Sequence, residues 1–409
     1  TMRSQFDPFD QRRVLVEMPG VRPANIDERG SESHVSSISL LDVGAVDEQS
    51  PDGLVFAFRR GSTDLKYCPD ILEDGASFTA ITLPTADNIQ DVQVGGDGRW
   101  IWMTNATGLY RAKCQGETPG TWGLIYSMDQ LYAGAGFGSA VPEEYTPFLK
   151  IKPIPGSDWV MMLAVFNGIY SGDAYAEVAL LAVRNGRIDV IEKTWSDLGG
   201  ERWDIGANFE DVTDIVLYKY SGSDEEIKVD GLLSVAGGDG TLHAYLFHFN
   251  WEPNADSALI YDWSTDATSL SKIAISGVRN TDTMFYYIDD HVNVGGKKLY
   301  RGRFGKYGYV AGLWKETIIQ SADRVFLTAA SDTHLMCKGY KSNDGGRTWT
   351  ADGLSESGTV YEKVALAPMV WVACASDGNV KLTTDFGTTW TTIENIGAAA
   401  YKLRIANGG

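Results

Sequence analysis

The chain has few of the residues that mark several familiar classes of protein. Its 409 residues include only four cysteines, Cys68, Cys114, Cys337 and Cys374, with no Cys-x-x-Cys spacing among them. Four are too few for a disulfide framework in a chain of this length, so we expect buried free thiols on strands, with a Cys337–Cys374 pair as the open alternative. No apolar run approaches the roughly 18 residues that a membrane helix needs.

The N-terminal residues also lack the apolar segment of a secretory signal. We therefore expect synthesis in the cytoplasm without a signal peptide, and a final location in a virion or other extracellular particle. A mature chain from which a signal had been cleaved would look the same.

Positive charge is scarce. Lys and Arg number 35 against 54 Asp and Glu, which gives a formal net charge of −19. Such a field repels phosphate backbones, so nucleic acid is not an expected partner.

Metal and cofactor motifs are missing as well. The five histidines form no HxxxH or HExxH pattern, and there is no phosphate-binding or dinucleotide-binding glycine motif. We predict no cofactor and no metal. Calcium in the acidic segments 223–226 or 289–290 is the alternative, and solvated acidic turns explain these segments more simply.

What the chain does have is strand pattern. Apolar and aromatic runs of five to eight residues recur along it, for example at 53–58, 100–103, 159–165, 245–249 and 284–287. Asp-Gly pairs, which favour hairpin turns, stand between many of them, at 52–53, 74–75, 97–98, 239–240, 344–345 and 377–378. Helical periodicity is nearly absent, so the fold class is all-β.

The strands group in fours, and a period of 40 to 50 residues with four strands each is typical of a β-propeller. We predict a single propeller of about seven blades over 35–409, preceded by an extended arm over 1–34. The predicted blades cover 35–82, 88–127, 147–196, 212–263, 271–319, 323–352 and 359–394. Residues 398–406 are predicted to return to the first blade as a closing strand.

One motif occurs twice near the C-terminus, in the pattern Ser/Thr-x-Asp-x-Gly-x-Thr-Trp. Asp385 follows Asp344 by 41 positions, which is the blade spacing. The first copy contains Ser342, Asp344, Gly346, Thr348 and Trp349, and the second contains Thr383, Asp385, Gly387, Thr389 and Trp390. A degenerate third copy is predicted at 73–78, with Glu73 in the position of the Asp.

Each residue type in the motif suits a turn. The carboxylate accepts hydrogen bonds from backbone N–H groups, the glycine adopts a left-handed conformation, and the Trp buries a large ring between blades. We therefore predict that these ten residues fold a hairpin between third and fourth strands and take no part in catalysis.

By these residues the chain resembles the Asp-box, or BNR-repeat, propellers, which include sialidases, other glycosidases, sortilin-like receptors and photosystem assembly factors. The resemblance implies the propeller fold and, often, binding of glycans or protein partners at one face. It does not imply a single activity.

A sialidase-like chain should carry an Arg-Ile-Pro motif before its first Asp boxes, and none is present. Other glycosidases need two carboxylates at a defined separation, which a chain with 54 acidic residues can always offer by chance. We accordingly predict no catalytic residues.

The leading hypothesis is a non-catalytic propeller that serves as a structural or binding module. It would belong to a larger assembly such as the tail or surface of a bacteriophage, with protein partners contacted through residues 1–34. The alternatives are a glycan-binding or glycan-hydrolysing propeller and, third, an assembly factor.

Overall fold

The structure of the chain is a computed structural model. It describes residues 53–95, 100–115, 118–154, 157–170, 173–193, 214–223, 226–236, 242–251, 257–262, 270–276, 284–289, 297–303, 314–319, 327–331, 333–337, 339–354, 360–375, 377–397 and 401–405. The predicted arm at 1–34 lies outside these ranges. Within them no helix is long and apolar enough to cross a membrane.

The described strands form seven antiparallel sheets, numbered here in chain order. Sheet 1 consists of β29 (Tyr401–Ile405), β1 (Val55–Arg59), β2 (Leu65–Cys68) and β3 (Thr79–Ala80). Sheet 2 consists of β4 (Ile89–Val94), β5 (Trp100–Asn105), β6 (Gly108–Gln115), β7 (Thr118–Pro119) and β8 (Gly123–Ser127). Sheet 3 consists of β9 (Thr146–Pro153), β10 (Val160–Tyr170), β11 (Asp173–Arg184) and β12 (Arg187–Lys193).

The other four sheets each contain four consecutive strands. Sheet 4 consists of β13 (Asp214–Ser223), β14 (Glu226–Ala236), β15 (Leu242–Trp251) and β16 (Ser257–Asp262). Sheet 5 consists of β17 (Leu270–Ser276), β18 (Met284–Asp289), β19 (Lys297–Arg303) and β20 (Trp314–Ile319). Sheet 6 consists of β21 (Leu327–Ala329), β22 (Leu335–Cys337), β23 (Tyr340–Ser342) and β24 (Thr350–Ala351). Sheet 7 consists of β25 (Val360–Ala367), β26 (Val370–Ala375), β27 (Asn379–Thr383) and β28 (Thr391–Asn395).

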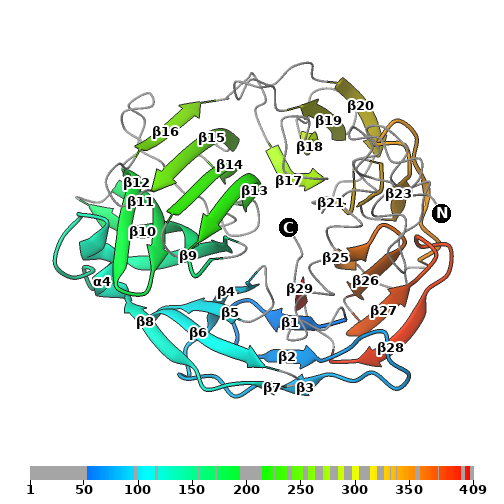
Figure 1. The fold of residues 1–409 in the computed structure, drawn as a ribbon, viewed down its shortest axis with the longest axis horizontal. Coiled ribbons are helices and arrows are strands. Elements are labelled where there is room, and N and C mark those ends of the chain that lie inside the picture. Colours follow the sequence, from blue (N-terminus) through cyan, green and yellow to red (C-terminus); the bar gives the residue numbers. More distant parts are fainter. Residues whose placement is uncertain are drawn as a thin grey trace, which may run out of the picture.

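The sheets stand around a common centre, each with one strand at the inside (Figure 1). The inner strands contact one another in a closed circle, in the order β29, β4, β9, β13, β17, β21, β25 and back to β29. Four-stranded antiparallel sheets arranged radially in this way are the architecture of a β-propeller. The sheets also occupy the intervals that the sequence predicts for its groups of strands. Sheet 2 departs from the four-strand expectation because the short β7 and β8 both pair with β6.

The apolar core lies between neighbouring sheets rather than inside any one of them. Successive side chains of a strand point to opposite faces, so a strand with a sheet on either side is apolar at every position. In β10, Met161 and Leu163 join a cluster with residues of sheet 4. The intervening Met162 and Ala164 join another cluster with Trp102 of sheet 2. This explains why β10 shows a continuous apolar run in the sequence instead of an alternating one.

The predicted closing strand is confirmed. β29 pairs antiparallel with β1, from Val55 opposite Ile405 to Arg59 opposite Tyr401. Leu403 and its neighbours at alternate positions, Tyr401 and Ile405, are buried against sheet 7. The inner strand of the first sheet therefore comes from the C-terminal end of the chain.

One helix, α4 (Met128–Gly134), was not expected from the sequence. It follows β8 and begins at a capping box, in which the Ser127 hydroxyl accepts from the Gln130 N–H and the Gln130 side chain accepts from the Ser127 N–H. Leu131 and Tyr132 are buried against sheets 2 and 3. A helix of seven residues has too few turns for its periodicity to stand out, and tertiary packing stabilises it.

Truncation tests the closing strand. Ending the chain after Gly397 removes β29 and the burial of Tyr401, Leu403 and Ile405. Each such side chain contributes roughly 1.5–3 kcal/mol, so we expect a loss of about 5 kcal/mol or more, measured by urea unfolding. Ending the chain after Ile405 is the matched control and should leave stability nearly unchanged. Equal stability of the two truncated chains would contradict the closing role.

Candidate functional site

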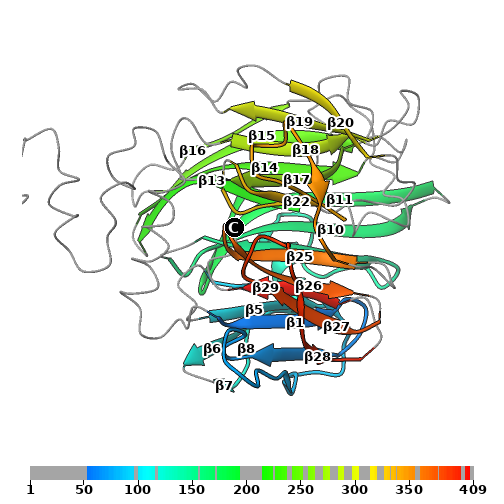
Figure 2. The same cartoon turned by 90° about the vertical axis from the view of Figure 1, so that its right-hand side faces the viewer.

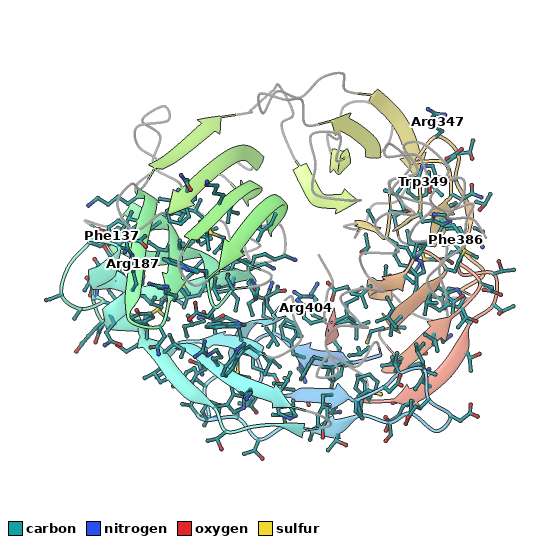
Figure 3. All side chains as sticks on the ribbon, viewed as in Figure 1. Phe137, Arg187, Arg347, Trp349, Phe386 and Arg404 are labelled. Atoms are coloured by element: carbon teal, nitrogen blue, oxygen red, sulfur yellow. The ribbon has the colours of Figure 1, made fainter. Side chains whose placement is uncertain are left out.

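The two motif copies form loops of the same structure, called here the Asp loops and comprising residues 342–349 and 383–390. The first connects β23 to β24 and the second connects β27 to β28, which are the third and fourth strands of sheets 6 and 7. Figure 3 shows the first loop at the outside of the ring, where Arg347 and Trp349 are labelled. The predicted position of the motif within the sheet is thus confirmed.

The carboxylates hold the loops in the predicted way. Asp344 Oδ1 accepts from the backbone N–H of Arg347 at 3.0 Å and of Thr348 at 2.9 Å, and Oδ2 accepts from the Thr348 hydroxyl at 2.7 Å. The Ser342 hydroxyl donates to Asp344 Oδ1 and accepts from the Gly346 N–H, both at 2.8 Å. These bonds close the turn on itself.

The second loop repeats these bonds of the carboxylate and the hydroxyl. Asp385 accepts from the N–H groups of Thr388 and Thr389 at 2.9 and 2.8 Å, and from the Thr389 hydroxyl at 2.7 Å. Thr383 takes the place of Ser342 and bonds to Asp385 and to the Gly387 N–H, both at 2.8 Å. The bonds from Thr389 and Thr383 lower the pKa of Asp385 well below that of a free aspartate.

The backbone conformation explains the glycines and one exception. Gly346 and Gly387 have φ of 83° and 68°, in the left-handed region. The preceding position also needs a positive φ, and Gly345 supplies it in the first loop, whereas Phe386 adopts φ 54° in the second. The Phe386 ring is buried against Trp371, with 6.2 Å between ring centroids, which offsets a strain of about 1 kcal/mol.

The Trp of the second loop joins two sheets. Trp390 Nε1 donates to the Asp352 carbonyl oxygen of sheet 6 at 2.8 Å. Next to it, Gly353 lies so close to the loop that a Cβ would stand 2.7 Å from the Thr388 oxygen. The second Asp loop thus both closes its own hairpin and packs against the neighbouring sheet, as the sequence predicts for Trp390. Trp349 instead donates to the Gly346 carbonyl oxygen of its own loop at 3.1 Å.

The predicted third copy needs a correction. Residues 69–78 do connect the third and fourth strands of sheet 1, but the residue in the place of Asp344 is Asp70, not Glu73. Asp70 stands two positions after the end of β2, and its Oδ1 accepts from the Leu72 N–H at 2.8 Å. Glu73 contributes its backbone oxygen to the Ala76 N–H instead. Leu72 and Asp74 stand where the motif has its Gly and Thr, so this loop shares the position of the Asp loops but not their motif.

A second constellation, which the sequence did not reveal, lies on the inner strands, where Figure 3 labels Arg404. Arg404 of β29 contacts Glu362 of β25 through Nη1 at 3.2 Å and Asp91 of β4 through Nη2 at 3.4 Å. Its Nε donates to the Val92 carbonyl oxygen at 2.9 Å. Asp91 in turn lies 4.0 Å from Lys150 of β9. We call Glu362, Arg404, Asp91 and Lys150 the charge chain; it links four neighbouring sheets.

Asp91 is the centre of the charge chain and is fully buried. It also accepts from the backbone N–H groups of Val92 at 3.0 Å and Ile151 at 3.1 Å. Burial acts to raise its pKa, but the positive charges of Lys150 and Arg404 outweigh burial and leave the pKa lowered. The carboxylate therefore stays ionised inside the protein.

Sheets 6 and 7 share another buried ion pair. Lys363 of β25 contacts Asp352, and both side chains are almost completely buried. The ammonium also donates to the Cys337 carbonyl oxygen at 3.2 Å.

The four cysteines are free and buried, so the predicted free thiols are confirmed and the alternative Cys337–Cys374 pair is wrong. Burial raises the pKa of Cys337 to about 12, so this thiol is not a nucleophile at neutral pH.

The predictions on metals stay open. Among the described residues no group of three or more His, Cys, Asp and Glu side chains has the arrangement of a metal site. The two acidic segments proposed as calcium alternatives fall partly outside the described ranges.

Comparison with known proteins finds distant similarity to solved structures. No protein-family model matches the sequence, and no curated protein does. One similar solved structure is YCF48 bound to D1 peptide, with 14% identity over 87% of this chain and 95% of that chain and a TM-score of 0.42. Another is a putative 6-phosphogluconolactonase from Bacteroides uniformis, with 10% identity over 86% of this chain and 99% of that chain and a TM-score of 0.45. A third is the WD40 domain of SCAP from fission yeast, with 7% identity, coverage of 85% and 88%, and a TM-score of 0.36. With all three scores below 0.5, the description of the fold rests on the strand pairing and on the circle of inner strands.

The charge chain predicts a large cost for removing its central charge. Asp91→Asn leaves Lys150 and Arg404 buried without their shared counter-charge, and we expect a loss of roughly 3–5 kcal/mol in urea unfolding. Asp189→Asn is the matched control, because it breaks the half-exposed Arg187–Asp189 pair and should cost about 1 kcal/mol or less. Similar losses in both variants would contradict the special role of Asp91.

The Asp loops predict a pH dependence. The pKa of Asp385 is lower in the fold than in the unfolded chain, so its carboxylate stabilises the fold above about pH 4, and this contribution is lost as the pH falls through the folded-state pKa. The difference in melting temperature between the wild type and Asp385→Asn should be greatest near neutral pH and shrink in acid. The same substitution at the exposed Asp74 is the control for the loss of one surface charge. A difference for Asp385→Asn that persists unchanged into strong acid would contradict the prediction.

Proposed function

We propose that the chain is a non-catalytic propeller of about seven blades that serves as a structural or binding module of a larger assembly. The observation that carries the proposal is the use of its charged groups. The charge chain connects four sheets, the Lys363–Asp352 pair joins sheets 6 and 7, and the Asp-loop carboxylates close hairpins. These groups are engaged in holding the ring together, which suits a rigid scaffold.

The surface charge indicates the kind of partner. A net charge of −19 attracts basic protein surfaces over distances of about a Debye length and repels other acidic molecules. We propose that the partners are other proteins of one assembly, and in particular that the chain is a tail or surface protein of a bacteriophage virion. Support for the virion comes from the sequence, through the polar segment 1–34 and the lack of a catalytic signature.

The second candidate is an Asp-box propeller that binds or hydrolyses glycans. It is favoured by the two Asp loops, whose carboxylate hydrogen bonds repeat, since the Asp-box propellers that the sequence resembles often bind glycans. An assembly factor is the third candidate. Neither alternative gains support from a described ligand-binding geometry.

Particle purification tests the main proposal. Particles from the producing culture are separated on a density gradient, and each fraction is analysed for this chain by quantitative mass spectrometry. We expect the chain to sediment with capsid proteins at a fixed stoichiometry that survives a salt wash. Recovery only in the free-protein fractions would overturn the virion proposal, and binding on a glycan array together with activity in a glycosidase screen would favour the second candidate.

A further inference from the structure

The hairpin formed by β10 and β11 is longer than the sheet that carries it. β9 accompanies β10 only as far as Asn167, which lies opposite Thr146. β12 accompanies β11 only from Ala179 onward. Between these limits the two strands pair only with each other among the described strands, ending at Tyr170 opposite Asp173. Residues 167–178 are called here the arm of sheet 3, or simply the arm, and are distinct from the N-terminal arm predicted over 1–34. Figure 2 shows β11 extending beyond the strands of the neighbouring sheets.

The base of the arm is held by a dedicated set of contacts. The buried Phe166 ring meets the Tyr132 ring of α4 edge to face, with 4.8 Å between centroids, and Phe137 packs on both at 5.9 and 5.6 Å. The Tyr132 hydroxyl donates to Glu177 Oε2 at 2.5 Å. Asp129 accepts from the Val141 N–H at 2.9 Å and so fixes the segment that follows the helix. Segment 127–141 therefore acts as a buttress that orients the arm.

The outer edge of the arm is suited to pairing with another strand. Over Asp173–Val178 no described strand pairs with the side of β11 that faces away from β10. Such an edge presents a row of backbone N–H and C=O groups, and proteins usually protect it with lysine or proline. Neither residue occurs between 173 and 178, where the sequence is Asp-Ala-Tyr-Ala-Glu-Val.

The charge around the β11 edge indicates which kind of segment would bind there. The only charged residues in 166–178 are Asp173 and Glu177, both acidic, and the whole chain carries a net charge of −19. A second copy of the chain would be repelled, whereas a basic segment would be attracted. We propose that the β11 edge at Asp173–Val178 binds an extended basic segment of a partner protein as an added β-strand. This inference rests on the proposed role as a binding module and names the surface.

A synthetic probe tests the inference. The probe is a fluorescein-labelled eight-residue peptide that alternates lysine and valine, and its comparison peptide has the same charge with a central valine replaced by proline. Fluorescence anisotropy with the full chain should show at least tenfold weaker binding of the proline peptide, because proline interrupts strand pairing. Equal binding of the two peptides would mean charge attraction alone and would overturn the proposal.

Two pairs of variants locate the site. Replacing residues 168–175 with an Asn-Gly turn shortens the arm but keeps Phe166 and Glu177, and it should abolish the preference between peptides without changing the melting temperature. Asp173→Lys should weaken probe binding several-fold more than Glu143→Lys, which makes the same charge change at an exposed position outside the arm. An unchanged preference in the shortened variant would sink the proposal. Incorporation of that variant into particles at normal stoichiometry would reject the arm as the docking surface while leaving the proposed function intact.

Discussion

The ring depends on one side chain at the point where it closes. Arg404 sits on the strand that returns from the C-terminal end, and its guanidinium contacts a carboxylate of the sheet on each side while its Nε bonds to a backbone oxygen. Glu362 also accepts from the Leu403 N–H at 2.6 Å, so it binds both the backbone of the closing strand and the Arg404 side chain. A circle of sheets held only by apolar layers could slide in register, because dispersion contacts are not directional. The ion pairs fix one position of each of these sheets relative to its neighbour.

Fixing that position with buried charges carries a large desolvation free energy. Desolvation of Asp91 and Lys150 costs several kcal/mol per ion before their attraction is counted, and apolar residues of the same shape could stabilise the interface equally well. Placement of the charges on inner strands is consistent with a role in register, since the inner strands determine how every sheet is oriented. The Asp loops solve a different problem at the periphery, where short strands such as β24, with two residues, need a closed turn to be held at all.

Much of the fold could be predicted from the sequence because its signals are local. The strand intervals follow from apolar runs bounded by Asp-Gly pairs, and the closing strand follows from alternating Tyr401, Leu403 and Ile405. The carboxylate hydrogen bonds of the Asp loops span at most four residues, so their pattern is visible in the motif itself. Other features depend on neighbours distant in sequence. Arg404 and Asp91 are 313 positions apart, and nothing near either residue indicates the other. The loop that contains Asp70 was missed because it lacks the Gly and Thr of the motif, and only the sheet topology shows that it takes the place of an Asp loop. The helix α4 is too short for its periodicity to be recognised in the sequence, and it is stabilised by the hydrogen bond from Tyr132 to Glu177 of sheet 3.

The origin of β29 has a consequence for biosynthesis. Arg59 leaves the ribosome 342 residues before its partner Tyr401, so at roughly 5–20 residues per second the first sheet waits on the order of 20 to 70 seconds for its inner strand. During that interval β1 has an open edge, and six other sheets form in turn beside it. The ring therefore cannot close until β29 has been synthesised, and a chain whose synthesis stops before Tyr401 would keep the inner edge of its first sheet open.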